Sequence, residues 1–182
     1  MADNCFAGAY LETVNHCPND AIVGGLSVDL FYIPASNIDT FTPPTVTATS
    51  TYAERMTLAA VTPATGKGWK RLSVMVDENE LANNFVGNKG NKKPKVELDC
   101  MLPNFKKSNL GFTVLHKNTP MVYAIKDSNS QFWIIGTPYA PAFFETADAK
   151  TGKKYDDNSG ITMKISANCQ LWAFDGVIAE TP

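Results

Sequence analysis

Two apolar runs separated by a polar connector place the strongest limit on what this chain can fold into. The runs are MVYAI at 121–125 and FWIIG at 132–136, and the connector between them ends in DSNSQ. Both runs are rich in β-branched and aromatic residues, whereas the connector is rich in residues that favour turns. The pattern predicts a β-hairpin over 121–136.

The residues that follow predict an antiparallel meander. A third apolar run occupies 140–146, and a polar loop at 150–160 leads into ITMKISANC. In that last segment apolar residues at 161, 163, 165 and 167 alternate with polar ones. Strict alternation is typical of a strand with one buried and one solvated face.

The segment 132–135, the second strand of the predicted hairpin, lacks this alternation. A strand that is apolar at every position is commonly buried on both faces. We expect one face to meet the core and the other to meet a helix or a neighbouring subunit. The candidates for core or subunit interface are Phe132, Trp133, Ile134 and Ile135.

A second, longer hairpin is predicted in the middle of the chain. Leu72, Val74 and Val76 share one face of a segment at 68–80, and alternation returns at 95–101. Two strands thus flank VGNKGNKKP at 86–94, a connector that no core would accept. The basic residues of this tip are Lys89, Lys92 and Lys93.

The best helix candidate is the segment 103–120. Pro103 suits the first turn of a helix. We read His116 as a capping or surface histidine near the helix C-terminus rather than as a catalytic base. One stripe along this helix is formed by Phe105, Asn109, Phe112 and His116.

The N-terminal third carries weaker signals. Residues 1–20 show no period and read as an N-terminal arm. The segment 21–34 reads as a strand, in which Gly24 and Gly25 mark a bulge or a close approach of another backbone. The Thr/Pro-rich segment 35–50 predicts an extended, exposed stretch with the character of an edge strand. The segment 51–63 is ambiguous between helix and strand.

Length and composition fit one globular domain over residues 1–182. Hydrophobic residues make up 44% of the chain and charged residues 19%, which is globular rather than disordered. No apolar run approaches the ~20 residues that cross a bilayer. The first residues are acidic where a signal peptide needs a basic region. We therefore expect no membrane contact, and a protein that stays in the cytosol of the cell that makes it.

Charge is distributed unevenly along the chain. Residues 1–60 hold six acids and one base, whereas residues 61–120 hold ten bases and five acids. Copies of such a chain are able to meet with opposite charges in contact. A solvated surface without consequence is the alternative interpretation.

No catalytic, cofactor-binding or metal-binding motif is recognisable. VGNKGNKK lacks the spacing of a P-loop, and DSNSQF lacks the glycine of a calcium loop. Cys5, Cys17, Cys100 and Cys169 match no zinc spacing, and we read all four as reduced, buried side chains. The adjacent His16 and Cys17 have no further ligands or orienting acid nearby. We expect no enzyme and no cofactor.

The last third of the chain resembles the C-terminal part of bacteriophage tail tube proteins, the major tail proteins. In that family a lysine–aspartate hairpin ending in glycine precedes a threonine–glycine–lysine loop and a last strand. A helix before the hairpin, and the passage at 32–39, are similar more loosely. The matching residues are Lys126, Asp127, Ile135, Gly136, Thr151, Gly152, Lys153, Asp157, Asn158 and Gly160.

The resemblance implies a mainly β fold: an antiparallel β-sandwich or barrel with one flanking α-helix and a long β-hairpin. It also implies a structural virion protein that self-assembles into rings, usually hexameric, with a β-lined channel. Such rings stack into the tail tube, contact other phage tail proteins and conduct DNA without specific binding. The protein would be found in the virion tail, and in the host cytoplasm before assembly.

Two alternatives stay open at this point. One is a ring-forming protein of the tail hub or of the head–tail connector. The other is a monomeric β-sandwich that binds a carbohydrate or a protein. Particle size separates them, because a tube protein elutes as rings or polymers and a binding module elutes as a monomer.

Two expectations follow from the tube interpretation. A conduit should not grip DNA, so we expect few Lys or Arg on the strands that face the lumen. The lysine-bearing tip at 86–94 should reach an adjacent ring and meet acidic residues there. A solvated tip and a nonspecific DNA contact are the alternatives for this tip. The acidic candidates are Asp20, Asp29 and Asp39.

Overall fold

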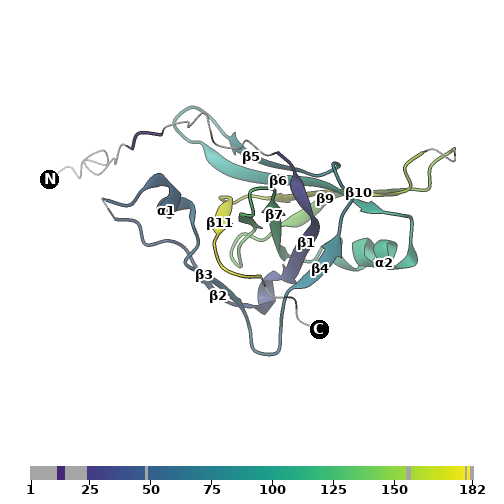
Figure 1. Ribbon diagram of the computed structural model, residues 1–182, viewed down its shortest axis with the longest axis horizontal. Helices are drawn as coiled ribbons and strands as arrows, with labels where there is room; N and C mark the ends of the chain where they lie inside the picture. Colours follow the sequence, from purple (N-terminus) through teal and green to yellow (C-terminus); the bar gives the residue numbers. More distant parts are fainter. Residues whose placement is uncertain (1–11, 15–23, 48, 155–156, 179, 181–182) are drawn as a thin grey trace.

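The computed structural model describes residues 12–14, 24–47, 49–154, 157–178 and 180. Most of its strands belong to two antiparallel sheets packed face to face (Figure 1). One α-helix of ten residues flanks the sandwich, and a long hairpin extends from it. The predicted fold class is therefore confirmed.

The first layer is a five-stranded sheet in the spatial order β11-β8-β7-β1-β4. Every neighbouring pair in it is antiparallel. Its strands are β1 (Leu26–Pro34), β4 (Lys70–Ser73), β7 (Met121–Asp127), β8 (Phe132–Ile135) and β11 (Trp172–Phe174).

The second layer is a four-stranded antiparallel sheet in the order β5-β6-β10-β9. The alternation predicted from residue 161 is confirmed in β10, where residues 161, 163, 165 and 167 are buried. The strands of this sheet are β5 (Glu80–Val86), β6 (Lys93–Pro103), β9 (Phe143–Lys150) and β10 (Gly160–Ala167).

Smaller elements cover the outer face of the five-stranded sheet. Strands β2 (Ile38–Thr42) and β3 (Ala60–Pro63) form a two-stranded sheet of their own. The short helix α1 (Tyr52–Met56) lies between them in the sequence, and a 3-10 turn (Ala35–Asn37) precedes β2. The segment 35–50 thus contains the predicted edge strand, and the ambiguous segment 51–63 contains both a helix and a strand.

Two hydrophobic clusters hold the layers together. The larger cluster lies between the two sheets and joins Tyr123 and Ile135 on one side to Leu98 and Ile165 on the other. The smaller cluster lies on the opposite face of the five-stranded sheet, beneath β2 and β3. Its buried members include Ile33, Val61, Trp69, Val122 and Ile134.

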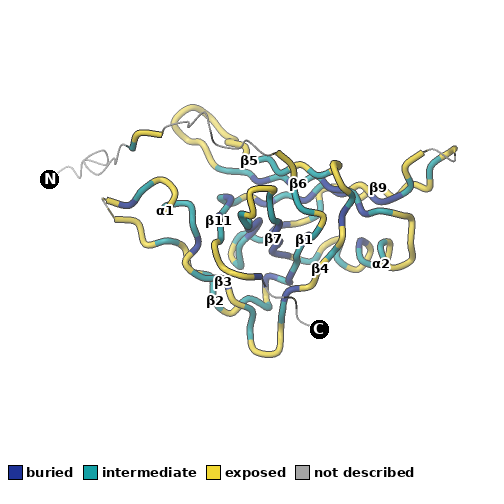
Figure 2. The backbone as a smooth tube through the Cα atoms, in the orientation of Figure 1, coloured by how far each residue is buried: buried dark blue, intermediate teal, exposed yellow. Residues whose placement is uncertain are grey.

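Strand β7 lies at the centre of the molecule, and both of its faces are therefore buried (Figure 2). Residues 121–125 are each no more than 1% exposed. Tyr123 enters the cluster between the sheets, and Val122 enters the cluster beneath β2 and β3. This explains why the MVYAI run is apolar at every position.

The hairpin predicted over 121–136 is confirmed as β7 paired with β8, and Asp127 organises its turn. Oδ1 of Asp127 accepts hydrogen bonds from the backbone N–H groups of Asn129 and Gln131, both at 2.9 Å. Oδ2 accepts a hydrogen bond from Nε1 of Trp133 at 2.9 Å. A single carboxylate therefore holds the turn and the strand that follows it.

The second backbone predicted to approach Gly24 and Gly25 is the same turn. The hydroxyl of Ser128 donates to the carbonyl of Gly24 at 3.0 Å, and the Ser128 N–H donates to the carbonyl of Gly25 at 3.2 Å. Gly25 has a φ of 99°, which favours glycine. The ladder between β1 and β7 shifts register just beyond, between Leu26 and Leu30.

The flanking helix is shorter than predicted. Helix α2 covers Lys107–His116 rather than 103–120. Pro103 is not in its first turn, because it ends β6, and Asn104 then takes a positive φ of 63° that breaks the chain direction. The side-chain amide of Asn109 donates to the carbonyl of Pro103 at 2.8 Å and so fastens the helix to the strand.

Three other expectations are corrected. Val76 does not share the buried face of Leu72 and Val74, since β4 ends at Ser73 and Val76 is 61% exposed. The hairpin strand before the basic connector is β5, and its ladder shortens that connector to 87–92. The predicted meander is broken between β8 and β9, because β8 pairs with β7 and β11 in one sheet, whereas β9 and β10 pair with each other in the other sheet.

Candidate assembly surfaces

The two edges of the five-stranded sheet are partly covered by other segments. Beside β11, the N–H of Leu58 donates to the carbonyl of Ala173 at 2.8 Å. Beside β4, Trp69 forms a bridge with Glu180, whose carboxylate lies 3.4 Å from Nε of Arg71. These contacts restrict the pairing of either edge with another chain.

The two edges of the four-stranded sheet have no such cover among the described residues. In that part of the chain, β5 pairs only with β6, and β9 pairs only with β10. Both edge strands are mostly exposed along their length (Figure 2). An exposed edge presents N–H and C=O groups that are ready to pair with another strand.

The outer face of the four-stranded sheet is polar and carries linked ion pairs. Nζ of Lys95 lies 2.7 Å from Oε1 of Glu97 and 2.8 Å from Oε1 of Glu145. Nζ of Lys164 lies 3.4 Å from the second carboxylate oxygen of Glu97. The network therefore connects three neighbouring strands, β6, β10 and β9.

The ion pairs that Lys95 makes keep their charges through neutral pH. Hydrogen bonds to Glu145 and Glu97 raise the pKa of Lys95. The hydrogen bond from Lys95 lowers the pKa of Glu97 and that of Glu145. By strand register, carboxylates slightly outnumber lysines on this face. The lysines are Lys93, Lys95, Lys150 and Lys164, and the carboxylates are Glu80, Glu97, Asp99, Glu145 and Asp148.

The three predicted contact lysines lie at the tip of the β5–β6 hairpin. Lys89 and Lys92 are exposed in the connector, and Lys93 begins β6 opposite Val86. Gly87 has a φ of 105°, and a Cβ there would lie 2.5 Å from the carbonyl oxygen of Asn91. The shape of the tip therefore depends on glycine.

The acidic residues proposed to meet this tip are not grouped. Asp20 lies outside the described residues, Asp29 lies 3.7 Å from Arg71, and Asp39 is exposed on β2. Sequence reasoning missed Asp77 and Glu78, which are exposed just before β5. They lie at the opposite end of the same hairpin from the lysines. The signal that identifies them is the sequence DENE directly before the β5 strand.

The four apolar residues predicted for the core or for a subunit interface divide between the two clusters. Ile134 and Phe132 join the cluster beneath β2 and β3, and Ile135 and Trp133 join the cluster between the sheets. Ile134 and Ile135 are fully buried, whereas Phe132 and Trp133 keep part of their surface exposed.

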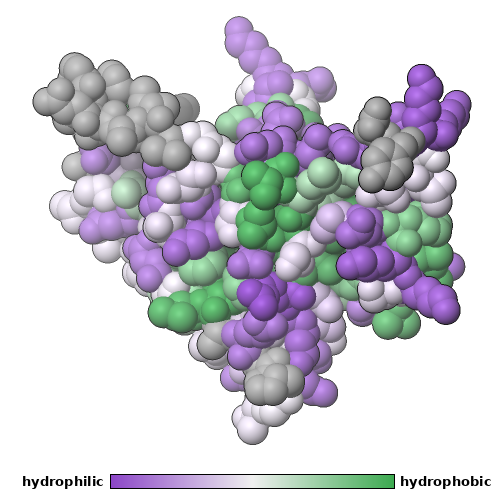
Figure 3. Space-filling view, turned by 45° about the vertical axis from the view of Figure 1, so that its right-hand side comes forward, coloured by the Kyte–Doolittle hydropathy of each residue, from purple (hydrophilic) through white to green (hydrophobic). Residues whose placement is uncertain are grey.

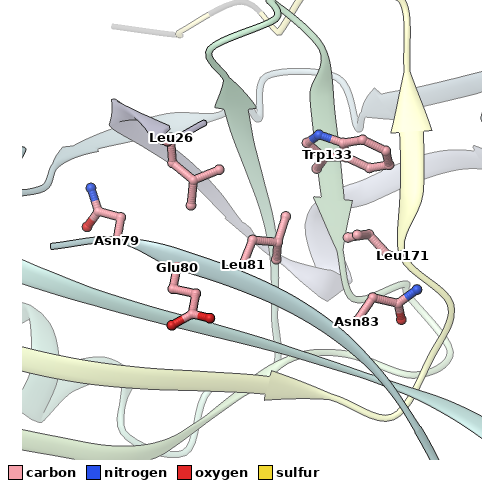
Figure 4. A pocket seen from close by; sticks show the side chains of 8 residues that line it. Leu26, Asn79, Glu80, Leu81, Asn83, Trp133 and Leu171 are labelled. Atoms are coloured by element: carbon pink, nitrogen blue, oxygen red, sulfur yellow. The ribbon is translucent and has the colours of Figure 1, made fainter. Parts of the chain in front are cut away.

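Trp133 also lines a groove of about 390 Å³ at the β5 edge of the sandwich (Figure 4). Oδ1 of Asn79 is buried beside it and accepts no hydrogen bond from the described residues. Glu80 points away from the groove, toward the outer face of the sheet. The apolar wall is formed by Leu26, Leu81, Trp133 and Leu171.

Some large apolar side chains reach the surface outside the groove. Phe85 and Val86 at the end of β5 are 65% and 44% exposed, and Phe143 at the start of β9 is 43% exposed. Leu115 on α2 is exposed as well. The space-filling view shows apolar surface in separate patches between hydrophilic side chains (Figure 3).

His116 and the described cysteines, the side chains considered for chemistry, are all at least partly buried. His116 is half-buried, with its ring centroid 5.0 Å from that of Phe112, and burial lowers its pKa. Burial raises the pKa of the Cys100 thiol to about 12. Cys169 is only partly buried, against expectation. Residues 5, 16 and 17 lie outside the described part.

No group of three or more His, Cys, Asp or Glu side chains in the described part of the chain is placed to hold a metal ion. No described helix combines the length and the apolar character that a membrane crossing needs.

No protein-family model, curated protein or solved structure matches this chain. The geometry defines a class of architecture: an antiparallel β-sandwich whose four-stranded sheet has a polar outer face and two edges that no described residue covers.

Proposed function

We propose that this protein is a structural virion protein that self-assembles into stacked rings and forms the tube of a bacteriophage tail. The observation that carries the proposal is a pair of edges on one sheet, β5 on one side and β9 on the other, that the described part of the chain leaves uncovered. A chain with two such edges is open to uncontrolled pairing. A closed ring removes both edges at once, because every β5 meets a β9.

The contact between neighbouring subunits is heterologous, since two different surface patches meet. Such a contact closes into a ring when the rotation between neighbours divides a full turn. We take six copies per ring from the resemblance to tail tube proteins. No catalytic step belongs to this function, and the protein would reside in the virion tail after assembly in the host cytoplasm.

The outer face of the four-stranded sheet is the surface that we propose for the channel lining. The outer face of the other sheet is covered by β2 and β3, whereas this face is solvated and polar. Its lysines are more numerous than we expected for a lumen. Lys95 and Lys164 are ion-paired, however, and carboxylates offset the charge. A face without excess positive charge supports passage of DNA without tight phosphate contacts.

Stacking of rings is the role that we propose for the tip lysines. Asp77 and Glu78 lie at the opposite end of the same hairpin, so two copies placed end to end bring opposite charges together. An exposed ion pair contributes only about 0–1 kcal/mol. A ring repeats each pair once per subunit, which makes the sum large enough to affect stacking.

Replacement of Lys89, Lys92 and Lys93 with Ser tests the stacking contact. We expect the melting temperature of the monomer to stay nearly unchanged and tubes to shorten or disappear. The measurement is sedimentation velocity combined with negative-stain imaging at low and high salt. High salt should shorten wild-type tubes too, because the Debye length falls from ~10 Å at 0.1 M to ~3 Å at 1 M.

The matched control replaces three exposed lysines elsewhere, Lys67, Lys107 and Lys117, with Ser. It changes the net charge equally and should leave tube length unchanged. Tubes of normal length from the tip variant at both salt concentrations would show that the tip does not join rings.

A ring in the tail hub or in the head–tail connector would use the same sheet edges. Imaging distinguishes it from the tube, because such a protein forms single rings that do not stack. The tip lysines would then have no role in assembly.

A monomeric binding module is the second candidate function, and the groove beside Trp133 favours it. An indole ring with apolar neighbours and an unpaired amide oxygen, Oδ1 of Asn79, fits a ligand with one apolar face and a hydrogen-bond donor, such as a sugar ring. This function requires a protein that stays monomeric at all concentrations.

A further inference from the structure

The direction of the strands determines how two copies can meet at the uncovered edges. All three pairings in the sheet β5-β6-β10-β9 are antiparallel, so β5 and β9 run in opposite directions. Rotation of a second copy about an axis roughly along the strands preserves strand direction. The second copy therefore presents β9 antiparallel to β5, and the alternation continues across the boundary.

The lengths of the two edge strands match when one bulge is counted. Strand β5 has seven residues and β9 has eight. In the existing ladder, Thr146 lies opposite Lys164 and Phe144 lies opposite Ile165, which leaves Glu145 as an extra, bulged residue. Seven residues of β9 are then available to face the seven residues of β5.

The side chains favour one alignment of these residues. When the start of β9 lies opposite the end of β5, Phe143 of the second copy faces Val86, and Phe144 faces Phe85. Phe85, Val86 and Phe143 are among the exposed large apolar residues of the isolated chain, so this pairing removes apolar surface from water. At the other end Lys150 of the second copy faces Glu80, its opposite charge.

Backbone hydrogen bonding agrees with this alignment. Along a strand, successive residues direct their backbone N–H and C=O groups alternately to one neighbouring strand and to the other. The chain of partners Glu80–Asp99, Asp99–Lys164 and Lys164–Thr146 links the two edge strands. It follows that the backbone N–H and C=O groups of residues 80 and 146 point the same way, either both toward the uncovered edge or both away from it. The backbone groups of residue 150 point the same way as those of residue 146, so residues 80 and 150 can face each other as a regular antiparallel pair. An odd shift in register would mismatch every pair.

The nearest even shifts are less favourable. A shift of two residues in one direction places Glu80 opposite Asp148 of the second copy, where two like charges meet. A shift in the other direction leaves Phe143 of the second copy beyond the end of β5. Neither shift pairs the exposed apolar ends of the two strands.

The groove beside Trp133 fits the same alignment. Leu81 and Asn83 belong to its lining and lie on the core side of β5. The residues of β9 that would face them are Ala149 and Ala147, which are exposed in the isolated chain. These small side chains would cover the edge of the groove without obstructing it.

We propose that β5 of one copy pairs antiparallel with β9 of a second copy, with Val86 opposite Phe143, Phe85 opposite Phe144, and Glu80 opposite Lys150. This inference rests on the proposed ring assembly and adds its register. The groove in Figure 4 is then an inter-subunit seam rather than a ligand site.

Disulfide trapping between variant copies tests the register. Directly opposite residues have Cα atoms about 4.5–5.5 Å apart, within the reach of a disulfide, whereas diagonal neighbours are about 7–8 Å apart. The register places Ala82 opposite Asp148. An Ala82→Cys copy mixed with an Asp148→Cys copy should form a disulfide-linked dimer on oxidation after assembly.

The controls separate this register from its neighbours. Mixtures of Ala82→Cys with Thr146→Cys, or with Lys150→Cys, sample the two shifted registers and should lose the dimer. Wild-type protein mixed with each variant measures dimers that form through the native cysteines. Dimers from a shifted pair, or from none of the three pairs, would overturn the proposed register.

Charge exchange provides a second test that needs no cysteine. Glu80→Lys and Lys150→Glu should each weaken ring formation, and the double variant should restore it. Failure of the double variant to restore rings would count against the proposed pairing. Electron microscopy separates two failures: rings with the wrong cross-link contradict only the register, whereas absence of rings from the wild-type protein contradicts the proposed function as well.

Discussion

At the scale of single residues, Asp127 connects a turn to the strand that follows it. Its carboxylate accepts hydrogen bonds from two backbone N–H groups in the turn and from the indole of Trp133. The turn contains Ser130 with a φ of 70°, a conformation that a serine adopts only when its surroundings hold it. The side chain of Asp127 therefore connects turn geometry to packing between the sheets.

Replacement of Asp127 by Ala should lower the free energy of unfolding by about 1–3 kcal/mol, because it leaves donors without an acceptor. Asp127→Asn is the matched control. It keeps one oxygen for the two backbone N–H groups and loses the acceptor for Trp133, so it should be destabilised less. Urea unfolding measures both. An unchanged midpoint for Asp127→Ala would show that the turn is held by other contacts.

Replacement of Trp133 by Ala should cost about 3–5 kcal/mol, since its ring packs against the cluster between the sheets. Its partial exposure places the expected value at the lower end of that range. Trp133→Phe retains an aromatic ring and loses the hydrogen bond to the Asp127 carboxylate, which is worth about 1.5–3 kcal/mol. Unchanged denaturant melts together with lost assembly would instead place Trp133 in the subunit interface.

At the scale of elements, the sequence predicted what depends on nearby residues. The hairpin of β7 and β8 and the alternating strand β10 were recognisable because turn formers and periodicity are local signals. Strand β5 was missed as a separate element, since LANNF carries little alternation. The start of the helix was misplaced because Pro103 suits both the first turn of a helix and the end of a strand.

Beyond the hairpins, the sequence did not reveal how the strands are divided between the two sheets. Strand β9 follows β8 after a short loop, yet it pairs with β10 in the other sheet. Which edges stay uncovered depends on that order, as does the grouping of Lys95, Glu97 and Glu145 on one face. Such long-range features arise only from the packing of the two sheets.

The ion-paired face gives a prediction about DNA. Wild-type protein should bind duplex DNA weakly at physiological salt, because carboxylates offset its lysines. The double variant Glu97→Gln with Glu145→Gln leaves Lys95 without a charged partner and makes the face positive. We expect tighter and more salt-sensitive binding in a gel shift. The comparison is informative only for assembled protein, so both samples are imaged first.

Tight, salt-sensitive binding by the wild type would favour a nucleic-acid-binding module over a conduit. Equal binding by the wild type and the double variant would show that this face does not contact DNA. The variant Asp175→Asn serves as a control, since Asp175 follows β11 in the other sheet.

At the scale of the whole molecule, the distribution of covered and uncovered surface is the decisive property. The five-stranded sheet has its outer face covered by β2 and β3 and its edges restricted by other segments. The four-stranded sheet has a polar outer face and, among the described residues, two edges without cover. Closed rings built from this chain would pair both edges and leave the polar face toward the channel.

Negative-stain imaging of the purified wild-type protein over a range of concentrations is the most direct test of the proposed ring assembly. We expect hollow rings with a central channel, and stacks of such rings that lengthen as concentration rises. Sedimentation of the same samples should show large particles in place of the 19.8 kDa chain. A single species of monomer size at every concentration, with no rings in the images, would contradict it.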